Sequence, residues 1–242
     1  MSWALMAICF FLFAWKFPTT EKAARSPLAP YRCIQALLYL LVAVLFGAIA
    51  SSATADAATV RVPDVDARLR LMVEQAVADE WGVDGSPALL AAQLHQESSW
   101  NTHARSAAGA EGLAQMMPAT GRWLASLFPQ LGAYDPWDPA WSARAAAVYD
   151  HWLLVRNPGL GECSNWAFAL SAYNGGETLL HREQHLAATY GRQPLRWFGN
   201  TADYRARSLP AWQQNRQYVQ HILLVLEPAY VANGWSGQVL CT

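Results

Sequence analysis

The sequence predicts a mainly α-helical globular domain at residues 58–242, behind an N-terminal leader. Apolar residues recur every three or four positions along this domain, which is the spacing of a buried helix face. Capping residues and prolines precede these periodic segments, as they do at helix starts. The sequence has no succession of segments in which apolar and polar residues alternate, the pattern typical of strands. A domain of 185 residues buries about 70% of the surface of its unfolded chain.

Two apolar runs dominate the leader, which we place at residues 1–57. The second run, residues 34–50, follows Arg32 and is succeeded by small residues up to Ala57. A positive flank, an apolar run and an Ala-x-Ala triplet are typical of a secretory signal peptide. The alternative is an uncleaved inner-membrane anchor at residues 34–50, since about 20 residues span a bilayer. Both interpretations place the domain outside the cytoplasm, in the periplasm or facing the cell wall.

The charge of the chain is low and unevenly distributed. The leader carries four basic and two acidic residues, whereas the domain carries 13 arginines, no lysine and 16 acidic residues. We expect no nucleic-acid partner, because proteins that bind nucleic acid usually present a basic surface. The lack of lysine excludes Schiff-base chemistry and a phosphate-binding P-loop from the domain.

The domain contains two cysteines, Cys163 and Cys241. An even pair in an oxidising compartment predicts one disulfide, and the alternative is two free buried thiols. No histidine stands at ligand spacing near either cysteine, so we predict no metal site.

Start and stop signals define the predicted helices. The first spans residues 66–81 and stops at Gly82, and Ser86-Pro87 open the second with an N-cap and a first-turn proline. The others are a helix from Asp138-Pro139 to Asn157-Pro158-Gly159, one capped by Ser164 and ending at Gly175-Gly176, one at residues 177–190, and one from Pro210 to Leu226, before Pro228. In the helix opened by Asp138-Pro139, the predicted buried stripe is Trp141, Ala145, Val148, Trp152 and Val155. Residues 191–209 are expected to form an irregular loop.

Glu97 is the first residue to suggest chemistry. It lies three residues beyond Leu94 and seven beyond Leu90, so it continues the apolar face of its helix. A buried carboxyl group loses hydration, which raises its pKa and suits it to general acid catalysis. The alternative is a Glu97 carboxylate that is paired with an arginine such as Arg105.

Glu97 also begins a series of four short motifs. They are Glu97-Ser98, Gly109-Ala110-Glu111-Gly112-Leu113-Ala114-Gln115-Met116-Met117-Pro118, Ala172-Tyr173-Asn174-Gly175 and Gln214-Asn215-Arg216-Gln217-Tyr218-Val219. In content and order they resemble the soluble lytic transglycosylase (SLT domain) family. Proteins of this family have a lysozyme-like fold and cleave bacterial peptidoglycan, so we expect a single lysozyme-like domain at residues 58–242.

The resemblance implies a role for individual residues of this sequence. Glu97 corresponds to the single catalytic acid/base. Ser106 and Gln115 correspond to polar groups that hold the N-acetyl sugar at the scissile bond.

Three further residues are implied to line the cleft. Tyr173 and Asn174 would lie near the acid, and Tyr218 would reach it from the last helix. The alternative for Tyr173 and for Tyr218 is packing in the core.

The sequence departs from the family pattern at three places. Ala114 replaces a methionine, which predicts a smaller apolar wall of the sugar cleft. Gln214-Asn215 replaces a Glu-Thr pair and removes a charge. Trp100 keeps an aromatic residue after the Glu-Ser motif.

The resemblance implies a lytic transglycosylase reaction. Glu97 protonates the glycosidic oxygen between N-acetylmuramic acid and N-acetylglucosamine, and then takes a proton from the C6 hydroxyl as a 1,6-anhydro ring closes. No cofactor is expected. One alternative is a hydrolytic muramidase, which needs a second carboxylate, with Glu111 or Asp135 as candidates. The other is a non-catalytic peptidoglycan-binding component of a secretion or conjugation apparatus.

The expected partner is the peptidoglycan glycan strand. By analogy with other small exported enzymes of this type, a conjugation, secretion or phage envelope-spanning machine is a candidate second partner. Membrane contact is expected only through the leader.

Overall fold

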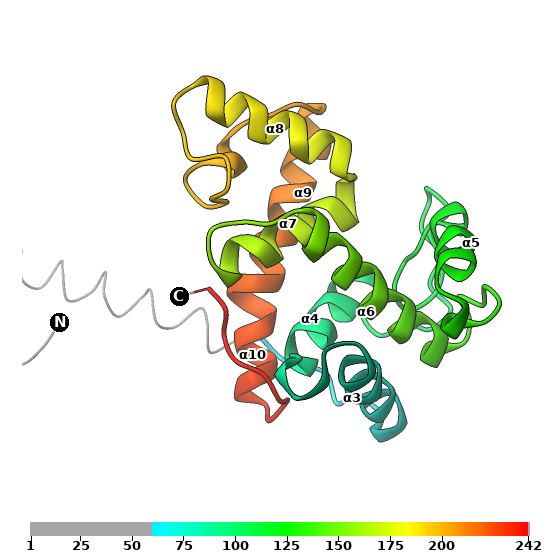
Figure 1. The fold of residues 1–242 in the computed structure, drawn as a ribbon. Helices are drawn as coiled ribbons and strands as arrows, with labels where there is room; N and C mark the ends of the chain where they lie inside the picture. The colour runs from blue at the N-terminus through cyan, green and yellow to red at the C-terminus, as the bar shows by residue number, and fades with distance from the viewer. Residues whose placement is uncertain (1–59, 242) are drawn as a thin grey trace, which may run out of the picture. The chain divides into compact units, whose positions relative to one another are not determined.

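The computed structural model describes residues 60–241, which consist of α-helices, short 3₁₀ and π turns, and loops (Figure 1). This range contains no β-strand, only two single bridges within one loop. The predicted mainly α-helical class is confirmed for the described residues. None of the described helices has the length and hydropathy needed to traverse a bilayer. The predicted leader, with its apolar run at residues 34–50, lies outside the described residues.

The helices and turns follow one another along the chain and leave two long loops, one before α5 and one before α9. Their order is α3(Ala67–Trp81), η2(Gly82–Asp84), α4(Pro87–Ser98), α5(Pro118–Leu127), η3(Pro129–Leu131), α6(Pro139–Arg156), α7(Glu162–Gly175), α8(Glu177–Thr189), η4(Thr201–Asp203), α9(Leu209–His221), η5(Ile222–Leu226) and α10(Glu227–Ala232).

The first two helices begin at the predicted residues. The Asp66 side chain accepts a hydrogen bond from the backbone N–H of Arg68 at 2.9 Å and caps α3. The Ser86 hydroxyl accepts one from the N–H of Leu89 at 3.2 Å and caps α4. Each cap satisfies an amide group that has no partner inside its helix.

The middle of the chain differs from prediction in two ways. Helix α5 is absent from the sequence prediction, because its start carries only Pro118 and no capping side chain. The predicted stripe of α6 is correct at Trp141 and wrong at Val155, which is 72% exposed, whereas Leu153 is buried. Helix α6 is buried on most of its faces because α3, α5 and α7 all pack against it, so no single stripe describes it.

The predicted cap of α7, Ser164, lies three residues after the observed N-cap, Gly161. The helix begins at Glu162 after Gly161, whose φ is 81°. Ser164 lies inside the helix and is buried, and its hydroxyl accepts a hydrogen bond from the backbone N–H of Trp197 at 3.3 Å. The serine therefore anchors the loop before α9, which is irregular as predicted apart from η4.

The last helix was expected to end before Pro228, and this prediction is wrong. The chain instead passes through the π turn η5 and continues as α10 to Ala232. Pro228 falls in the first turn of α10, where a missing backbone N–H is tolerated.

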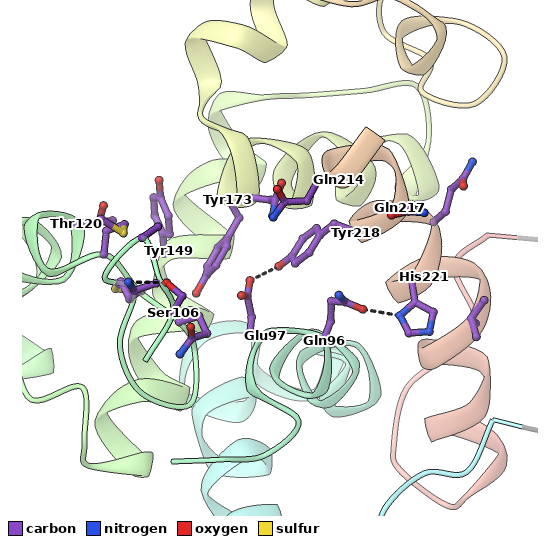
Figure 2. A pocket seen from close by; sticks show the side chains of 18 of the residues that line it. Gln96, Glu97, Ser106, Thr120, Tyr149, Tyr173, Gln214, Gln217, Tyr218 and His221 are labelled. Carbon is purple, nitrogen blue, oxygen red and sulfur yellow. Dashed lines mark hydrogen bonds between the residues drawn. The ribbon is translucent and has the colours of Figure 1, made fainter. Parts of the chain in front are cut away.

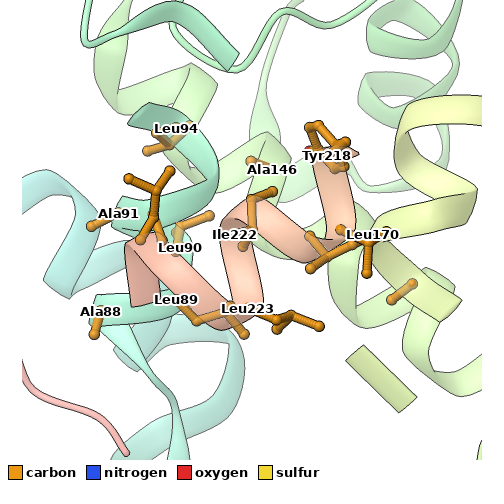
Figure 3. Packing of buried hydrophobic residues seen from close by; sticks show 14 of the residues in the cluster. Ala88, Leu89, Leu90, Ala91, Leu94, Ala146, Leu170, Tyr218, Ile222 and Leu223 are labelled. Atoms are coloured by element: carbon orange, nitrogen blue, oxygen red, sulfur yellow. The ribbon is translucent and has the colours of Figure 1, made fainter. Parts of the chain in front are cut away.

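The core is built around α4, which packs against η5 and α10, with apolar side chains of η5 beside it in Figure 3. Eight consecutive residues of α4, Pro87–Leu94, are buried. Around them lie apolar side chains from four other elements, including Ala146, Leu170, Tyr218, Ile222 and Leu223. Because Glu97 is in the last turn of α4, this packing sets its position.

Cys163 and Cys241 form a disulfide with their Cα atoms 5.1 Å apart. The bond joins the C-terminal tail to the first turn of α7. It is the pairing that the sequence predicts.

Candidate active site

A cleft of about 1030 Å³ brings the four motifs together (Figure 2). It is lined mainly by residues of α4, α7, α9 and the loop that precedes α5, with further residues from α5, α6 and η5. All six predicted site residues line it: Glu97, Ser106, Gln115, Tyr173, Asn174 and Tyr218. Glu97 is the only carboxylate among the described residues that line this cleft.

Glu97 lies at the centre of the cleft in Figure 2. Its Oε1 accepts a hydrogen bond from the Tyr218 hydroxyl at 2.6 Å. Burial raises the pKa of Glu97 to about 8, and the hydrogen bond from Tyr218 opposes part of that rise because it favours the carboxylate. Arg105, the alternative partner, pairs with Glu111 at 3.2 Å. Glu97 is therefore mainly protonated near neutral pH and has a proton to donate.

Tyr173 and Tyr218 both pack in the core and line the cleft. The ring of Tyr218 is 4% exposed and belongs to the core cluster, while its hydroxyl reaches Glu97. Tyr173 donates its hydroxyl proton to the carbonyl of Ala114 at 2.8 Å. Burial, followed by the nearby Glu97 carboxyl, raises the pKa of each tyrosine well above its usual value. The two proposed roles, packing and lining, are thus compatible.

Ala114, which was expected to make one apolar wall of the sugar cleft smaller, does not line the cleft. Its side chain is 1% exposed and lies in the core. Only its carbonyl acts at the site, as the acceptor for Tyr173.

The loop before α5 is closed by its own polar side chains. The Ser106 hydroxyl accepts from the N–H of Ala110 at 2.9 Å. The amide nitrogen of Gln115 donates to the carbonyls of Ala104 at 3.0 Å and Gly112 at 2.9 Å. Both N–H groups of the Gln115 side-chain amide are thereby used within the loop. The side-chain oxygen is the atom of Gln115 that is left to contact a sugar.

Two motif glycines are required by close packing. Gly112 has a φ of 74°, and a Cβ atom there would collide with the carbonyl of Pro136. At Gly175, the Arg207 guanidinium lies where a Cβ atom would be. Gly112 therefore lets the loop pass close to Pro136 and the start of α6. Gly175 leaves room for the Arg207 guanidinium, which belongs to an ion-pair network next to Asn174.

Asn215 of the last motif belongs to a buried hydrogen-bond network that includes these ion pairs. The amide nitrogen of Asn215 donates to Asn174 Oδ1 at 3.1 Å and to the Ser171 carbonyl at 2.9 Å. Arg216 donates to Asn215 Oδ1 at 2.7 Å and also to Glu183 at 2.8 Å. Asn215, one of the two residues that depart from the family pattern, therefore joins α9 to α7 through buried hydrogen bonds, whereas Gln214 lines the cleft.

The two carboxylates considered for a hydrolytic mechanism lie away from the cleft. Glu111 pairs with Arg105 and accepts from the Tyr134 hydroxyl at 2.8 Å. Asp135 is exposed and accepts from the backbone N–H groups of Trp137 and Asp138. Neither lines the cleft. Among residues 60–241, no group of three histidine, cysteine or acidic side chains is placed to hold a metal ion.

Two polar pairs near Glu97 are absent from the sequence predictions. Gln96 accepts a hydrogen bond from His221 Nδ1 across the cleft (Figure 2). Gln93 donates to the buried Asp150 at 3.2 Å. The four-residue spacing between Gln93 and Glu97 placed both on one helix face and was the available signal. Nothing in the sequence linked either residue to Asp150.

Comparison with known proteins identifies the family. The family model described as Transglycosylase SLT domain matches residues 74–195. The membrane-bound lytic murein transglycosylase F of Pasteurella multocida is 33% identical over 131 residues, which cover 54% of this chain and 24% of that protein. The protein of the same name from Vibrio cholerae is 32% identical over 133 residues, which cover 54% and 23% of the two chains. This chain thus matches about a quarter of the length of each relative.

Among solved structures, the 70 kDa soluble lytic transglycosylase from Escherichia coli matches with a TM-score of 0.49 and 21% identity. The match covers 70% of this chain and 26% of that one.

The chain belongs to the Transglycosylase SLT domain family. The family resemblance seen in the sequence is therefore confirmed. The family match includes Glu97, Ser106, Gln115, Tyr173 and Asn174 and ends before α9. The placement of Tyr218 rests on the cleft geometry.

Proposed function

We propose that this protein is a peptidoglycan lytic transglycosylase with Glu97 as its only catalytic carboxyl group. One observation carries the proposal: Glu97, with a pKa raised to about 8, is the single carboxylate lining the described cleft. Membership in the SLT family and the names of the relatives support peptidoglycan as the substrate.

The first step is protonation of the leaving group. Glu97 donates its proton to the glycosidic oxygen between N-acetylmuramic acid and N-acetylglucosamine. The acetamido group of the muramic acid stabilises the oxocarbenium-like centre, in place of a second protein carboxylate. As Glu97 becomes a carboxylate, the Tyr218 hydroxyl at 2.6 Å stabilises the new charge.

The second step is ring closure. The Glu97 carboxylate accepts the proton of the C6 hydroxyl while the C6 oxygen attacks C1. The product is a 1,6-anhydromuramoyl end, and Glu97 is again protonated. A single acid/base therefore completes the cycle without consuming water.

Mass spectrometry of muropeptides released from purified sacculi tests the proposal. We expect 1,6-anhydromuropeptides, each lighter by one water than the hydrolytic product. Products with only reducing ends would establish the hydrolytic alternative. The absence of release by the folded protein would support the non-catalytic alternative.

The Tyr218→Phe variant should change the pH dependence of turnover. Loss of the hydrogen bond removes the interaction that lowers the pKa of Glu97, so that pKa should rise above its value of about 8. The alkaline limb of kcat, where Glu97 loses its proton, should move to higher pH. Turnover should fall about 10- to 100-fold, because a hydrogen bond to a charged group contributes about 1.5–3 kcal/mol.

A kcat–pH profile of the two tyrosine variants measures this effect. Tyr173→Phe is the control, since its hydroxyl donates to the Ala114 carbonyl and not to Glu97. An alkaline limb that stays in place or moves to lower pH in Tyr218→Phe would contradict the assigned interaction.

We also propose that the domain works outside the cytoplasm, in contact with the cell wall. The Cys163–Cys241 disulfide supports this location, because disulfides persist in oxidising compartments. The curated relatives are named membrane-bound. We also predict cleavage near Ala57, which would give a mature domain at residues 58–242. Service to a larger envelope-spanning machine is a separate prediction. N-terminal sequencing of periplasmic protein tests the first.

A further inference from the structure

A second buried carboxyl group, Asp150, lies close to the cleft and has no part in the proposed mechanism. Asp150 is 1% exposed and belongs to α6, next to Tyr149, which lines the cleft. From α4, Gln93 is fully buried and donates from Nε2 to Asp150 Oδ1 at 3.2 Å. Gln93 precedes Glu97 by one helical turn, so this buried pair adjoins the catalytic carboxyl group.

The hydrogen bonding of this pair is incomplete if Asp150 is ionised. Asp150 Oδ2 and Gln93 Oε1 are both buried, and neither has a partner among the described residues. Both atoms are acceptors when Asp150 is a carboxylate, so neither can satisfy the other. Leaving a buried acceptor without a donor costs about 1–3 kcal/mol for each atom. One additional proton between the two side chains removes both deficits.

We propose that Asp150 is a neutral carboxylic acid that donates its proton from Oδ2 to Oε1 of Gln93. The two side chains then form a reciprocal pair, in which the amide donates to Oδ1 and the acid donates to Oε1. In this state every polar atom of the pair has a partner.

The groups around Asp150 favour the neutral form. Burial raises its pKa well above the usual value, and Glu97 raises it further whenever Glu97 is ionised. The donation from Gln93 Nε2 opposes only part of this rise. The other titratable groups that interact with Asp150 are the hydroxyls of Tyr173 from α7 and Tyr218 from α9, with Tyr149 from α6 itself. The groups named here include no cation that would stabilise a carboxylate.

If the proposed function is correct, a neutral Asp150 has two consequences for the reaction. It cannot act as a second catalytic carboxylate, since it is protonated and sealed from the cleft. It also places no charge next to Glu97, so the carboxylate that forms when Glu97 donates its proton meets no like charge from α6.

Unfolding equilibria of the Asp150→Asn variant test the proposal without any activity measurement. Asparagine preserves the reciprocal pair, because its amide can donate to Gln93 Oε1. In the wild type, unfolding releases the Asp150 proton at pH values between about 3.9, the pKa of an unfolded aspartate, and the raised pKa of the folded group. The wild-type unfolding constant should therefore rise relative to that of Asp150→Asn by about tenfold per pH unit between pH 5 and 7, or 1.36 kcal/mol per unit.

Asp79→Asn is the matched control, since Gln75 donates to Asp79 in an exposed Gln–Asp pair. Its unfolding constant should keep a constant ratio to that of the wild type over the same range. If the ratio of the wild-type unfolding constant to that of Asp150→Asn stays flat or falls with rising pH, Asp150 is ionised in the folded protein and the proposal is wrong.

Infrared spectroscopy supplies a test that needs no variant to fold. Wild-type protein labelled with ¹³C-aspartate should show an isotope-shifted C=O band of a protonated carboxyl group at pH 7. Absence of that band would overturn the proposal. Because neither measurement involves peptidoglycan, failure of this inference is separable from failure of the proposed function.

Discussion

Glu97→Gln is expected to lower the release of anhydromuropeptides by at least about 10²- to 10⁴-fold, the usual contribution of general acid catalysis. Glutamine keeps the shape of the side chain and can accept the hydrogen bond from Tyr218. It can neither donate a proton to the glycosidic oxygen nor remove one from the C6 hydroxyl. Both chemical steps are therefore impaired by one substitution.

Turnover of purified sacculi by the wild type and the variant measures this loss, with binding to sacculi measured in parallel. Binding should persist in Glu97→Gln, since the other cleft residues are intact. Glu111→Gln is the control, and should retain far more activity because Glu111 pairs with Arg105 away from the cleft. Near-normal release by Glu97→Gln would refute the single-acid mechanism.

The second large effect is expected on stability. Glu183 is fully buried in α8, where its two carboxylate oxygens accept from Arg207 at 2.9 Å and from Arg216 at 2.8 Å. Glu183→Gln removes the carboxylate that pairs with both buried guanidinium groups. Removing one partner of a buried ion pair costs about 3–5 kcal/mol, so the free energy of unfolding should fall by about that amount.

Denaturant unfolding of the variant and of Glu74→Gln measures the difference. Glu74 pairs with Arg70 at 2.8 Å as a partly exposed i,i+4 pair on α3, and such a helix pair contributes about 0.3–0.5 kcal/mol. Equal losses in the two variants would contradict a stabilising role for the buried network.

Local sequence signals identified most of the fold. Asp66 and Ser86 are capping residues whose effect acts within one turn, so their helix starts were predictable. Ser164 misled the prediction because its hydroxyl serves the distant loop before α9 rather than its own helix. Pro228 misled it because the preceding π turn places this proline in the first turn of α10.

The sequence by itself determined the helical class, the family and the identity of the candidate catalytic acid. Motif order is a property of the chain, and the place of Glu97 on an apolar helix face follows from helical spacing alone. Tertiary structure decided which groups act on Glu97. Tyr218 is 121 residues away in the sequence, and Asp150 reaches Gln93 from another helix, so neither contact has a local signal. Burial depends on the packing of all neighbouring helices, and for that reason only the folded chain sets the pKa that makes Glu97 an acid.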